Sequence, residues 1–316
     1  MLIRPQTTSF AKIRVMGIGG GGINALNTMI SQNQIQGVDF IAVNTDAQAL
    51  LLCQSPNKLQ IGEGLTKGLG SGGSPEIGKQ AAEESYDKIK EIIDGSDMIF
   101  LTAGMGGGTG TGGCPIIANA AKEVGALTVA VVTKPFSFEG ISRQKIAEAG
   151  LKKLKEKTDS LISISNDKLL DILDQNMPIS SAFWVCDEIL REAVSGISDL
   201  ILRPGIINVD FADVKAVMKD SGSAIFGVGR AKGEKRAEIA AKAALNSPLL
   251  GISPRGAKGV LFNVSGGRDI SLVEVEEIGK IITKEINPEA KVIFGAISDE
   301  KLNEGELKVT VIATGF

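Results

Sequence analysis

The sequence predicts an α/β protein with a parallel sheet in its amino-terminal part. Short apolar runs alternate there with amphipathic runs, which is the pattern that buried strands and the helices between them produce. Glycine-rich segments at 17–22 and 104–113 each follow one of these apolar runs. Such segments are typical of loops that join a strand to a phosphate-binding helix. The chain has 316 residues and a 43% apolar composition, so we expect two domains with well-packed cores.

The predicted strands of the amino-terminal part are short and apolar, and they lie at 13–16, 38–43, 98–102 and 127–133. Helices are expected between them, one over 23–30 and another over 116–124. Apolar residues then recur at helical spacing over 179–201, and the sequence Arg203-Pro204-Gly205 ends that pattern. We therefore expect one long helix in the middle of the chain.

The carboxy-terminal part has a different texture. Helical patterns at 214–219 and 234–245 precede strand-like runs at 259–264, 292–296 and 307–313, an order typical of a smaller α+β domain. The expected organisation is a flexible arm over 1–11, a sheet domain over 12–178, a central helix over 179–203 and a second domain over 204–316.

The composition excludes several classes of function. A net charge of −3 without a basic, aromatic-rich cluster argues against a nucleic-acid partner. The absence of histidine excludes Ser-His-Asp catalysis and imidazole zinc sites. The cysteines Cys53, Cys114 and Cys186 are odd in number and unrelated in spacing, as expected for reduced, buried thiols of a cytoplasmic protein. No run approaches the roughly 20 apolar residues of a membrane span, so direct membrane insertion is not expected.

The segment 104–113 gives the stronger signal of the two glycine segments. Glycines remove the Cβ atoms, so successive backbone N–H groups converge on phosphate oxygens, and the start of the following helix adds attraction. A flexible linker is the alternative. Linkers seldom lie between a strand and an amphipathic helix, so we favour a phosphate-binding loop.

The segment 17–22 also fits the pattern G-x-G-x-x-G, with Asp39 or Asp46 placed to hold a ribose. An NAD-dependent oxidoreductase is therefore one alternative. Two phosphate-binding loops at neighbouring strand ends instead favour a nucleoside triphosphate. A Walker motif at 73–79 is disfavoured, because Gln80 stands where its magnesium-binding Ser or Thr would be.

Several stretches together resemble the tubulin superfamily and its bacterial FtsZ branch, and the glycine loop does so residue for residue. They are 17–24, 43–49, 66–70, 104–112, 131–140, 166–170 and 208–214, in the family's order. The resemblance implies a tubulin-like fold with an amino-terminal Rossmann-like GTPase domain, a long central helix and a smaller carboxy-terminal activation domain. It also implies GTP and GDP as ligands, with Mg²⁺.

The resemblance assigns nucleotide contacts to residues of every loop at the strand ends. They are Gly20, Gly21, Gly22, Asn24, Asn44, Asp46, Ser71, Gly72, Gly73, Gly104, Gly106, Gly107, Gly108, Thr109, Gly110, Thr133, Pro135, Glu139, Arg143, Asn166, Phe183 and Asp187. No protein-derived metal site is expected.

Residue patterns alone leave ordinary structural roles open for several of these positions. Asn44 and Asp46 end a strand, where they contact sugar or phosphate, or where Thr45 or Asp46 caps the next helix. Glu139 and Arg143 are also spaced for a surface ion pair. The resemblance implies that Glu139 holds the ribose, that Arg143 lies near the nucleotide, and that 70–73 senses the terminal phosphate.

The assignment of the base-binding residues depends more on the resemblance than the assignment of the phosphate-binding loops does. By pattern Asn166 is a helix start and Asp187 lies on a helix face, whereas the resemblance has both read the guanine edge, with Phe183 against the base. A carboxylate accepts hydrogen bonds from the N1 and N2 donors that adenine lacks, so the site would reject ATP. This sequence departs from the usual family pattern at Ser165, Trp184 and Ile23.

The segment 208–214 combines an amide with two carboxylates just after the long helix. Asp210 as a helix cap and Asp213 in a first turn are ordinary helix-start residues. The resemblance implies instead that Asn208, Asp210 and Asp213 form a catalytic loop that completes the site of a neighbouring copy. The two acids would position water, while Mg²⁺ would bridge β- and γ-phosphate oxygens.

A site divided in this way predicts a head-to-tail homopolymer whose GTP hydrolysis depends on assembly. The resemblance implies a cytoplasmic protein that forms the ring at midcell in bacterial cell division. In that family a carboxy-terminal tail docks membrane-tethering division proteins, and this sequence contains no such tail. A filament protein that binds GTP without hydrolysing it is a further alternative.

Overall fold

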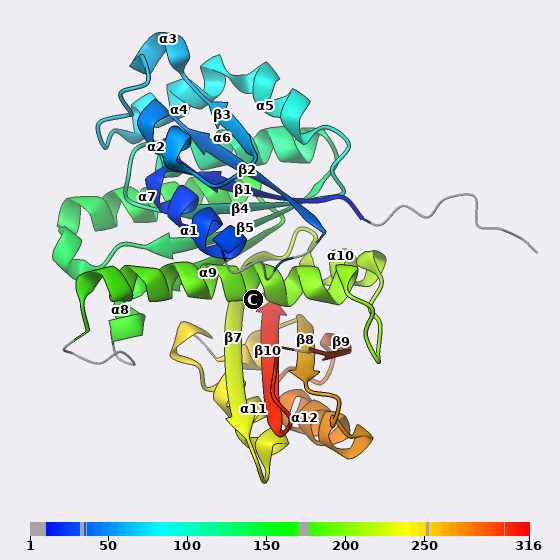
Figure 1. Ribbon diagram of the computed structural model, residues 1–316. Helices are drawn as coiled ribbons and strands as arrows, with labels where there is room; N and C mark the ends of the chain where they lie inside the picture. The colour runs from blue at the N-terminus through cyan, green and yellow to red at the C-terminus, as the bar shows by residue number, and fades with distance from the viewer. Residues whose placement is uncertain (1–10, 32–34, 36, 171–176, 251–252, 300) are drawn as a thin grey trace, which may run out of the picture.

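The computed structural model of this chain describes residues 11–31, 35, 37–170, 177–250, 253–299 and 301–316 (Figure 1). Apart from Ala11, the arm expected over 1–11 lies outside these residues. The described strands form one ten-stranded sheet in the order β3-β2-β1-β4-β5-β6-β7-β10-β8-β9. Their bounds are β1 Ile13–Ile18, β2 Val38–Asn44, β3 Asn57–Gln60, β4 Met98–Gly104, β5 Leu127–Lys134, β6 Ser160–Ser165, β7 Gly222–Lys232, β8 Gly259–Gly266, β9 Lys291–Ser298 and β10 Glu306–Thr314.

The sheet is parallel from β3 through β7, while β10 runs antiparallel to both β7 and β8. This confirms the predicted α/β class with a parallel amino-terminal sheet. The described helices are α1 Gly19–Ser31, α2 Ala47–Leu52, α3 Glu63–Thr66, α4 Pro75–Glu84, α5 Tyr86–Ile93, α6 Thr109–Glu123, α7 Ile141–Lys157, α8 Asn166–Leu170, α9 Ile179–Leu202, α10 Phe211–Met218, α11 Arg236–Leu245 and α12 Leu272–Lys284.

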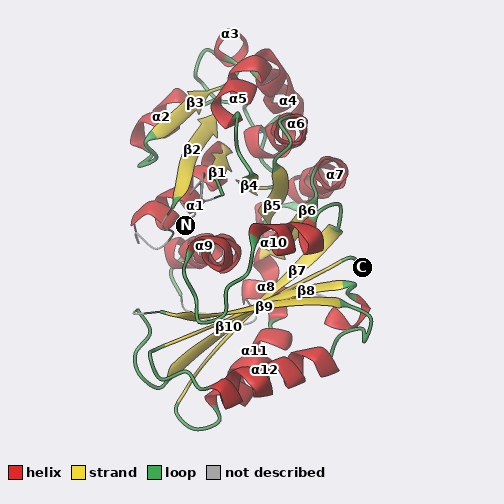
Figure 2. Cartoon of the chain, turned by 90° about the vertical axis from the view of Figure 1, so that its right-hand side faces the viewer, coloured by secondary structure: helices red, strands yellow, loops and turns green. Residues whose placement is uncertain are grey.

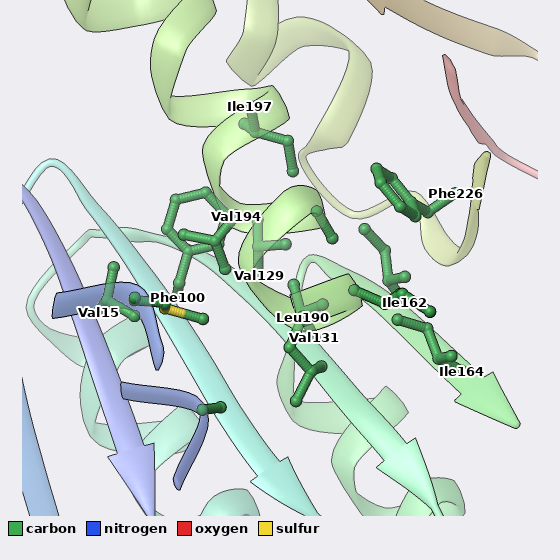
Figure 3. Packing of buried hydrophobic residues seen from close by; sticks show 14 of the residues in the cluster. Val15, Phe100, Val129, Val131, Ile162, Ile164, Leu190, Val194, Ile197 and Phe226 are labelled. Atoms are coloured by element: carbon green, nitrogen blue, oxygen red, sulfur yellow. The ribbon is translucent and has the colours of Figure 1, made fainter. Parts of the chain in front are cut away.

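The long helix α9 lies between the two halves of the sheet and is seen end-on in Figure 2. Its side chains Leu190, Val194 and Ile197 face apolar residues of β5, β6 and β7 (Figure 3). One buried cluster therefore contains residues from both halves. Burial of this kind removes apolar surface from water and stabilises the fold by about 25 cal/mol for each Å² buried. It also fixes α9 against both halves of the molecule.

The remaining faces of the sheet are covered by other helices. Helices α4 to α7 bury the second face of the amino-terminal strands, around Met16, Leu101 and Ile117. Helices α11 and α12 cover one face of the carboxy-terminal strands. All three cysteines are buried and free.

Two helices begin earlier than their apolar patterns predict, because glycine gives no side-chain periodicity. Helix α1 begins at Gly19 and α6 at Thr109, inside the glycine segments rather than at 23 and 116. Helix α10 begins at Phe211, three residues before its apolar pattern, and Asp210 is its N-cap residue, as the helix-start alternative predicted. The helical backbone consequently reaches the loops that were expected to bind phosphate.

Candidate functional site

The carboxyl ends of β1, β2, β4 and β5 meet at one edge of the sheet, where open α/β proteins bind ligands. The two glycine segments touch there. A Cβ atom on Gly21 would lie 3.1 Å from the backbone N of Gly104, and one on Gly19 would lie 3.0 Å from the N of Gly110. The two loops therefore form a single surface.

Two different structural reasons explain why glycine occurs at this edge. A Cβ on Gly108 would lie 2.3 Å from Ser71 Oγ, and one on Gly112 only 1.9 Å from Pro75 O, so packing excludes a side chain at both. At Gly20 and Gly107, by contrast, a Cβ would meet nothing within 4 Å, and neither has a left-handed backbone. Bare backbone that faces open space suits the close approach of a ligand.

The start of α6 lacks the side-chain cap that a helix usually has. Its N-cap residue is Gly108, which offers no side chain to the first backbone N–H groups. These donors and the positive end of the helix dipole are therefore free for an anion. Thr111 Oγ1 accepts a hydrogen bond from Gly106 N at 2.9 Å and so holds the preceding turn in place.

A buried hydroxyl cluster joins three loops at this edge. Thr109 Oγ1 lies 2.7 Å from Thr45 Oγ1 and 3.0 Å from Ser71 Oγ. The sequence predicted Thr109 and Ser71 as site residues but gave Thr45 only as an alternative helix cap. Its position between Asn44 and Asp46 was the one signal that could have identified it.

The residues after β2 have structural roles that are visible in the subunit. Asp46 caps α2 by accepting hydrogen bonds from Gln48 N at 2.9 Å and Ala49 N at 3.1 Å. Asn44 is buried, and its Oδ1 accepts from Thr45 N at 2.9 Å. The capping alternative is thus formed at Asp46, and both side chains border the glycine surface.

The turn at 70–73 carries three glycines with left-handed backbone: Gly70, Gly72 and Gly73 have φ of +85°, +58° and +77°. Side chains at Gly72 and Gly73 would meet nothing within 4 Å. Ser71, between Gly70 and Gly72, is buried against Thr109. One buried side chain therefore attaches a turn that otherwise faces open space.

The loop after β5 contains the ion pair that its spacing predicts. Arg143 Nη1 donates to Glu139 Oε2 at 2.6 Å, and Glu139 Oε1 accepts from Phe136 N at 2.9 Å. Thr133 and Pro135 are buried where this loop leaves the strand. Glu139 thus stabilises the loop whether or not it contacts a ligand.

A second group of residues surrounds the amino end of α9. Phe183 lies edge-on to Phe136 at 5.4 Å between ring centroids and is 41% exposed. Asn166, 4% exposed at the start of α8, has an Oδ1 atom with no hydrogen-bond partner. Burial raises the pKa of Asp187 to about 7. An orphan acceptor and a desolvated carboxyl beside an exposed ring suit a planar ligand with N–H donors.

The segment with Asn208, Asp210 and Asp213 lies at the opposite edge. Gly37, just before β2, packs on Leu202 at the end of α9, and Ser160 Oγ at the start of β6 donates to Met218 O of α10 at 2.6 Å. In Figure 1, α8 and α10 lie at opposite ends of α9. The 24 residues of α9 span about 36 Å.

The acidic residues of this segment are available at the surface. Asp210 is the N-cap residue of α10, yet its side chain makes no cap hydrogen bond. Asp210 is exposed and Asp213 half-buried, and in the described part of the chain neither takes part in an ion pair. Asn208 is engaged, because its Oδ1 accepts from Gly205 N at 2.7 Å.

One subunit therefore brings the strand-end residues together but leaves the acidic segment at the far edge. Gly22, Gly104, Gly106 and Gly110 lie within the glycine surface, and Asn24 is exposed on α1 beside it. Among the described residues, no group of three His, Cys, Asp or Glu side chains could hold a metal ion. None of the described helices is both long and apolar enough to cross a bilayer.

Two family models match this chain. Residues 12–174 match the GTPase domain of the Tubulin/FtsZ family, and residues 222–316 match the C-terminal domain of the FtsZ family. Among solved structures, an empty FtsZ dimer from M. jannaschii is 48% identical, with 97% of this chain and 89% of that chain covered and a TM-score of 0.92. A GTPγS-bound protofilament of CetZ2 from Haloferax volcanii shares the fold at 24% identity, with 96% and 92% covered and a TM-score of 0.80.

Proposed function

This chain belongs to the Tubulin/FtsZ family, and from that membership we propose that its two sheet edges form one GTPase site shared between successive copies of the chain. The family consists of GTP-binding GTPases that self-associate, and the oxidoreductase alternative has no support from it. The proposal concerns which residues act, and where.

The glycine surface would hold the phosphates of GTP. Gly20 and Gly107 present bare backbone to open space, and the uncapped start of α6 points N–H groups at the same region. The residues predicted from the sequence at 20–22, 104–110 and 71–73 all border it. A triphosphate there would be gripped from both sides by backbone donors.

The group at the amino end of α9 would hold the guanine. Asn166 supplies an unpartnered acceptor, Asp187 a second one, and Phe183 an exposed ring face. Glu139 and Arg143 would lie toward the ribose and phosphates. With this assignment the proposed GTP-binding domain, residues 12–178, contributes most of the pocket, and the central helix adds Phe183 and Asp187.

Magnesium fits this site as an ion carried by the nucleotide. The described residues offer no cluster of carboxylates, and Mg²⁺ in such sites takes most of its ligands from phosphate oxygens and water. The hydroxyls of Thr45, Ser71 and Thr109 offer oxygen ligands at the glycine surface. When bound, the ion would neutralise charge that develops on the phosphates.

Hydrolysis would occur at the junction between two copies. The observation that carries this proposal is the location of Asp210 and Asp213 at the sheet edge opposite the pocket, since α8 and α10 lie at opposite ends of α9, a helix about 36 Å long. A pocket on one face and acids on the opposite face make a heterologous contact, which gives an open filament when its rotation does not close a ring. Asp210 and Asp213 would position the attacking water and Asn208 would orient the phosphate.

In the cell, we propose that the filament forms the cytoplasmic division ring at midcell, attached to the membrane through tethering proteins that bind a carboxy-terminal tail. Loss of the γ-phosphate would change the contact between copies and favour disassembly. The domain division at 178 and 203 separates the pocket from the catalytic loop and the activation domain.

Phosphate release measured against protein concentration tests the proposal. We expect negligible turnover in dilute protein, a threshold, and a steep rise above it in step with sedimentable filaments. Turnover per subunit that is independent of concentration would contradict a shared site. Filaments without phosphate release would identify a non-hydrolysing filament protein instead.

A further inference from the structure

The backbone just before the acidic residues is attached to strand β9 of the carboxy-terminal half. Ile206 N and Ile207 N both donate to Ala296 O, at 2.7 and 3.1 Å, and Ala296 N donates back to Ile207 O at 3.2 Å. Gly205 fits against the same carbonyl, because a Cβ there would lie 2.6 Å from Ala296 O. Residues 205–207 therefore pair with β9 before α10 begins.

Packing reinforces this attachment from the side. A Cβ on Gly295 would lie 2.5 Å from Leu200 Cδ2 and 3.2 Å from Val209 Cγ2, so only glycine lets β9 come this close to α9 and the loop. Val209, next to Asp210, is 7% exposed. The backbone that precedes Asp210 and Asp213 is therefore held both by hydrogen bonds to β9 and by packing against it.

Arg203 joins the two elements that carry the loop. Its Nη1 lies 3.7 Å from Asp199 Oδ2, one turn back on α9, and its Nη2 lies 3.4 Å from Asp299 Oδ1, just after β9. Asp299 is itself fixed, since its backbone N donates to Gly266 O at 2.8 Å. The guanidinium thus lies between one carboxylate from each element.

Both carboxylates are poorly exposed, at 10% and 12% of their side-chain area, while that of Arg203 is 29% exposed. Ser195 Oγ donates to Asp199 Oδ2 at 3.1 Å and orients it. A planar guanidinium can hold two carboxylates in a fixed relation, which a single ammonium cannot do. Removing Arg203 would leave the ammonium of Lys308, whose charge acts on both Asp199 and Asp299, but no planar guanidinium to hold the two carboxylates in a fixed relation.

We propose that Arg203 is a positioning residue for hydrolysis: by holding the last turn of α9 against the end of β9, it sets where Asn208, Asp210 and Asp213 meet the nucleotide of the next copy. Its effect on turnover rests on the proposed function. The attachment of the loop to β9 does not. Arg203 acts through the loop backbone and touches no reacting atom.

The test compares Arg203→Gln and Arg203→Lys with a matched control, Arg255→Gln, which removes an exposed arginine paired with Glu285 in the same half. Three quantities are measured: GTP affinity of dilute subunits, turnover per subunit in filaments, and hydrogen exchange of the Ile206 and Ile207 amides. Because a misplacement of about 1 Å can cost about a hundredfold in rate, we expect Arg203→Gln to lose about ten- to a hundredfold in turnover.

In the same variant, we expect faster exchange at both amides and unchanged GTP affinity. Arg203→Lys should keep part of the turnover, since one carboxylate can still be held, and Arg255→Gln should match the parent in every measurement. Combining Arg203→Gln with Asp299→Asn should lose no more turnover than Arg203→Gln alone.

Wild-type turnover in Arg203→Gln filaments would overturn the proposal. So would lost turnover with unchanged exchange at Ile206 and Ile207, because Arg203 would then act on the nucleotide directly. If the parent protein shows no concentration-dependent turnover, the shared-site function fails, while the exchange measurement still decides whether Arg203 holds the loop.

Discussion

The two edges of the amino-terminal sheet use different parts of the chain for different purposes. At the carboxyl edge, bare backbone at Gly20 and Gly107 and the buried hydroxyl of Thr109 form the surface. At the amino edge, Asp210 and Asp213 lie at the start of α10, just after a segment that pairs with β9. The first edge suits anion binding and the second suits the handling of water.

In the proposed function, neither edge would be sufficient alone. A pocket lined with backbone N–H groups would stabilise phosphate charge, while the carboxylate of Asp46 at that edge already caps α2. The acidic loop would offer carboxylates to orient an attacking water, but within one subunit it lies across the length of α9. In the proposed function, a division of this kind would make turnover a property of the contact between copies.

The largest expected effect comes from separating the two edges by mutation. Asp213→Asn should retain GTP binding but lose about a hundredfold or more in turnover, because the water loses its positioning carboxylate. Gly107→Val should lose GTP binding but keep an intact acidic loop. Mixing the two variants should restore turnover, since the pocket of one meets the loop of the other.

Phosphate release from each variant and from their mixture provides the measurement. Asp220→Asn is the matched control, because Asp220 is an exposed acid close in sequence that pairs with Lys122. It should turn over GTP like the parent. A mixture no more active than its components would show that both edges serve the same subunit.

A smaller effect distinguishes the two kinds of glycine within the carboxyl edge. Gly112→Ala should destabilise the fold by about 1–3 kcal/mol, because the new methyl would overlap Pro75 O. Gly107→Ala should leave the unfolding midpoint unchanged yet weaken GTP binding by about tenfold. Thermal unfolding and nucleotide titration of both variants measure this. Unchanged GTP affinity in Gly107→Ala would remove Gly107 from the pocket.

The smallest effect is a pH dependence at the guanine group. The pKa of Asp187 is raised to about 7 by burial, and in the proposed pocket guanine would bind the ionised form of this side chain. Protonation therefore competes with binding, and GTP affinity should fall about tenfold between pH 8 and pH 6. Folding of the free subunit takes up this proton, so the same group lowers stability as pH rises from about 4 to 7.

Titration of labelled GTP at several pH values checks this prediction. Asp187→Asn should bind GTP more weakly at pH 8 and show no such dependence. An equal slope in both proteins would place the titrating group elsewhere, either on the nucleotide or on another side chain.

Local patterns were sufficient for much of the fold. The helical spacing over 179–201 predicted α9 to within one residue of its end at Leu202, and the apolar runs located β1, β2, β4 and β5. Strand β7 was missed, because Gly222–Lys232 mixes glycine with charged residues and shows little apolar alternation. Its pairing with β6 depends on contacts between distant segments, which periodicity does not reveal.

The candidate site divides in a similar way. Glycine loops after strands predict a phosphate site, because a loop whose backbone approaches phosphate closely favours glycine, and glycine is visible in the sequence. The group of Asn166, Asp187 and Phe183 leaves none, since each looks like an ordinary helix residue and Asn166 belongs to a different helix from the other two. Asp46 has a capping role that its sequence position also predicted, and a ligand role there stays a prediction.

The junction between the amino-terminal and carboxy-terminal halves, where β6 pairs with β7, has a mechanical consequence. Strands β6 and β7 pair through only three register positions, Ser160 with Gly222, Leu161 with Ser223 and Ile162 with Ala224. Tension applied along a chain of such subunits would pass through this narrow ladder and through the side chains packed around α9. The two halves are therefore joined by a short ladder and by the side chains packed around α9. A twist of one half against the other would displace the segment that pairs with β9.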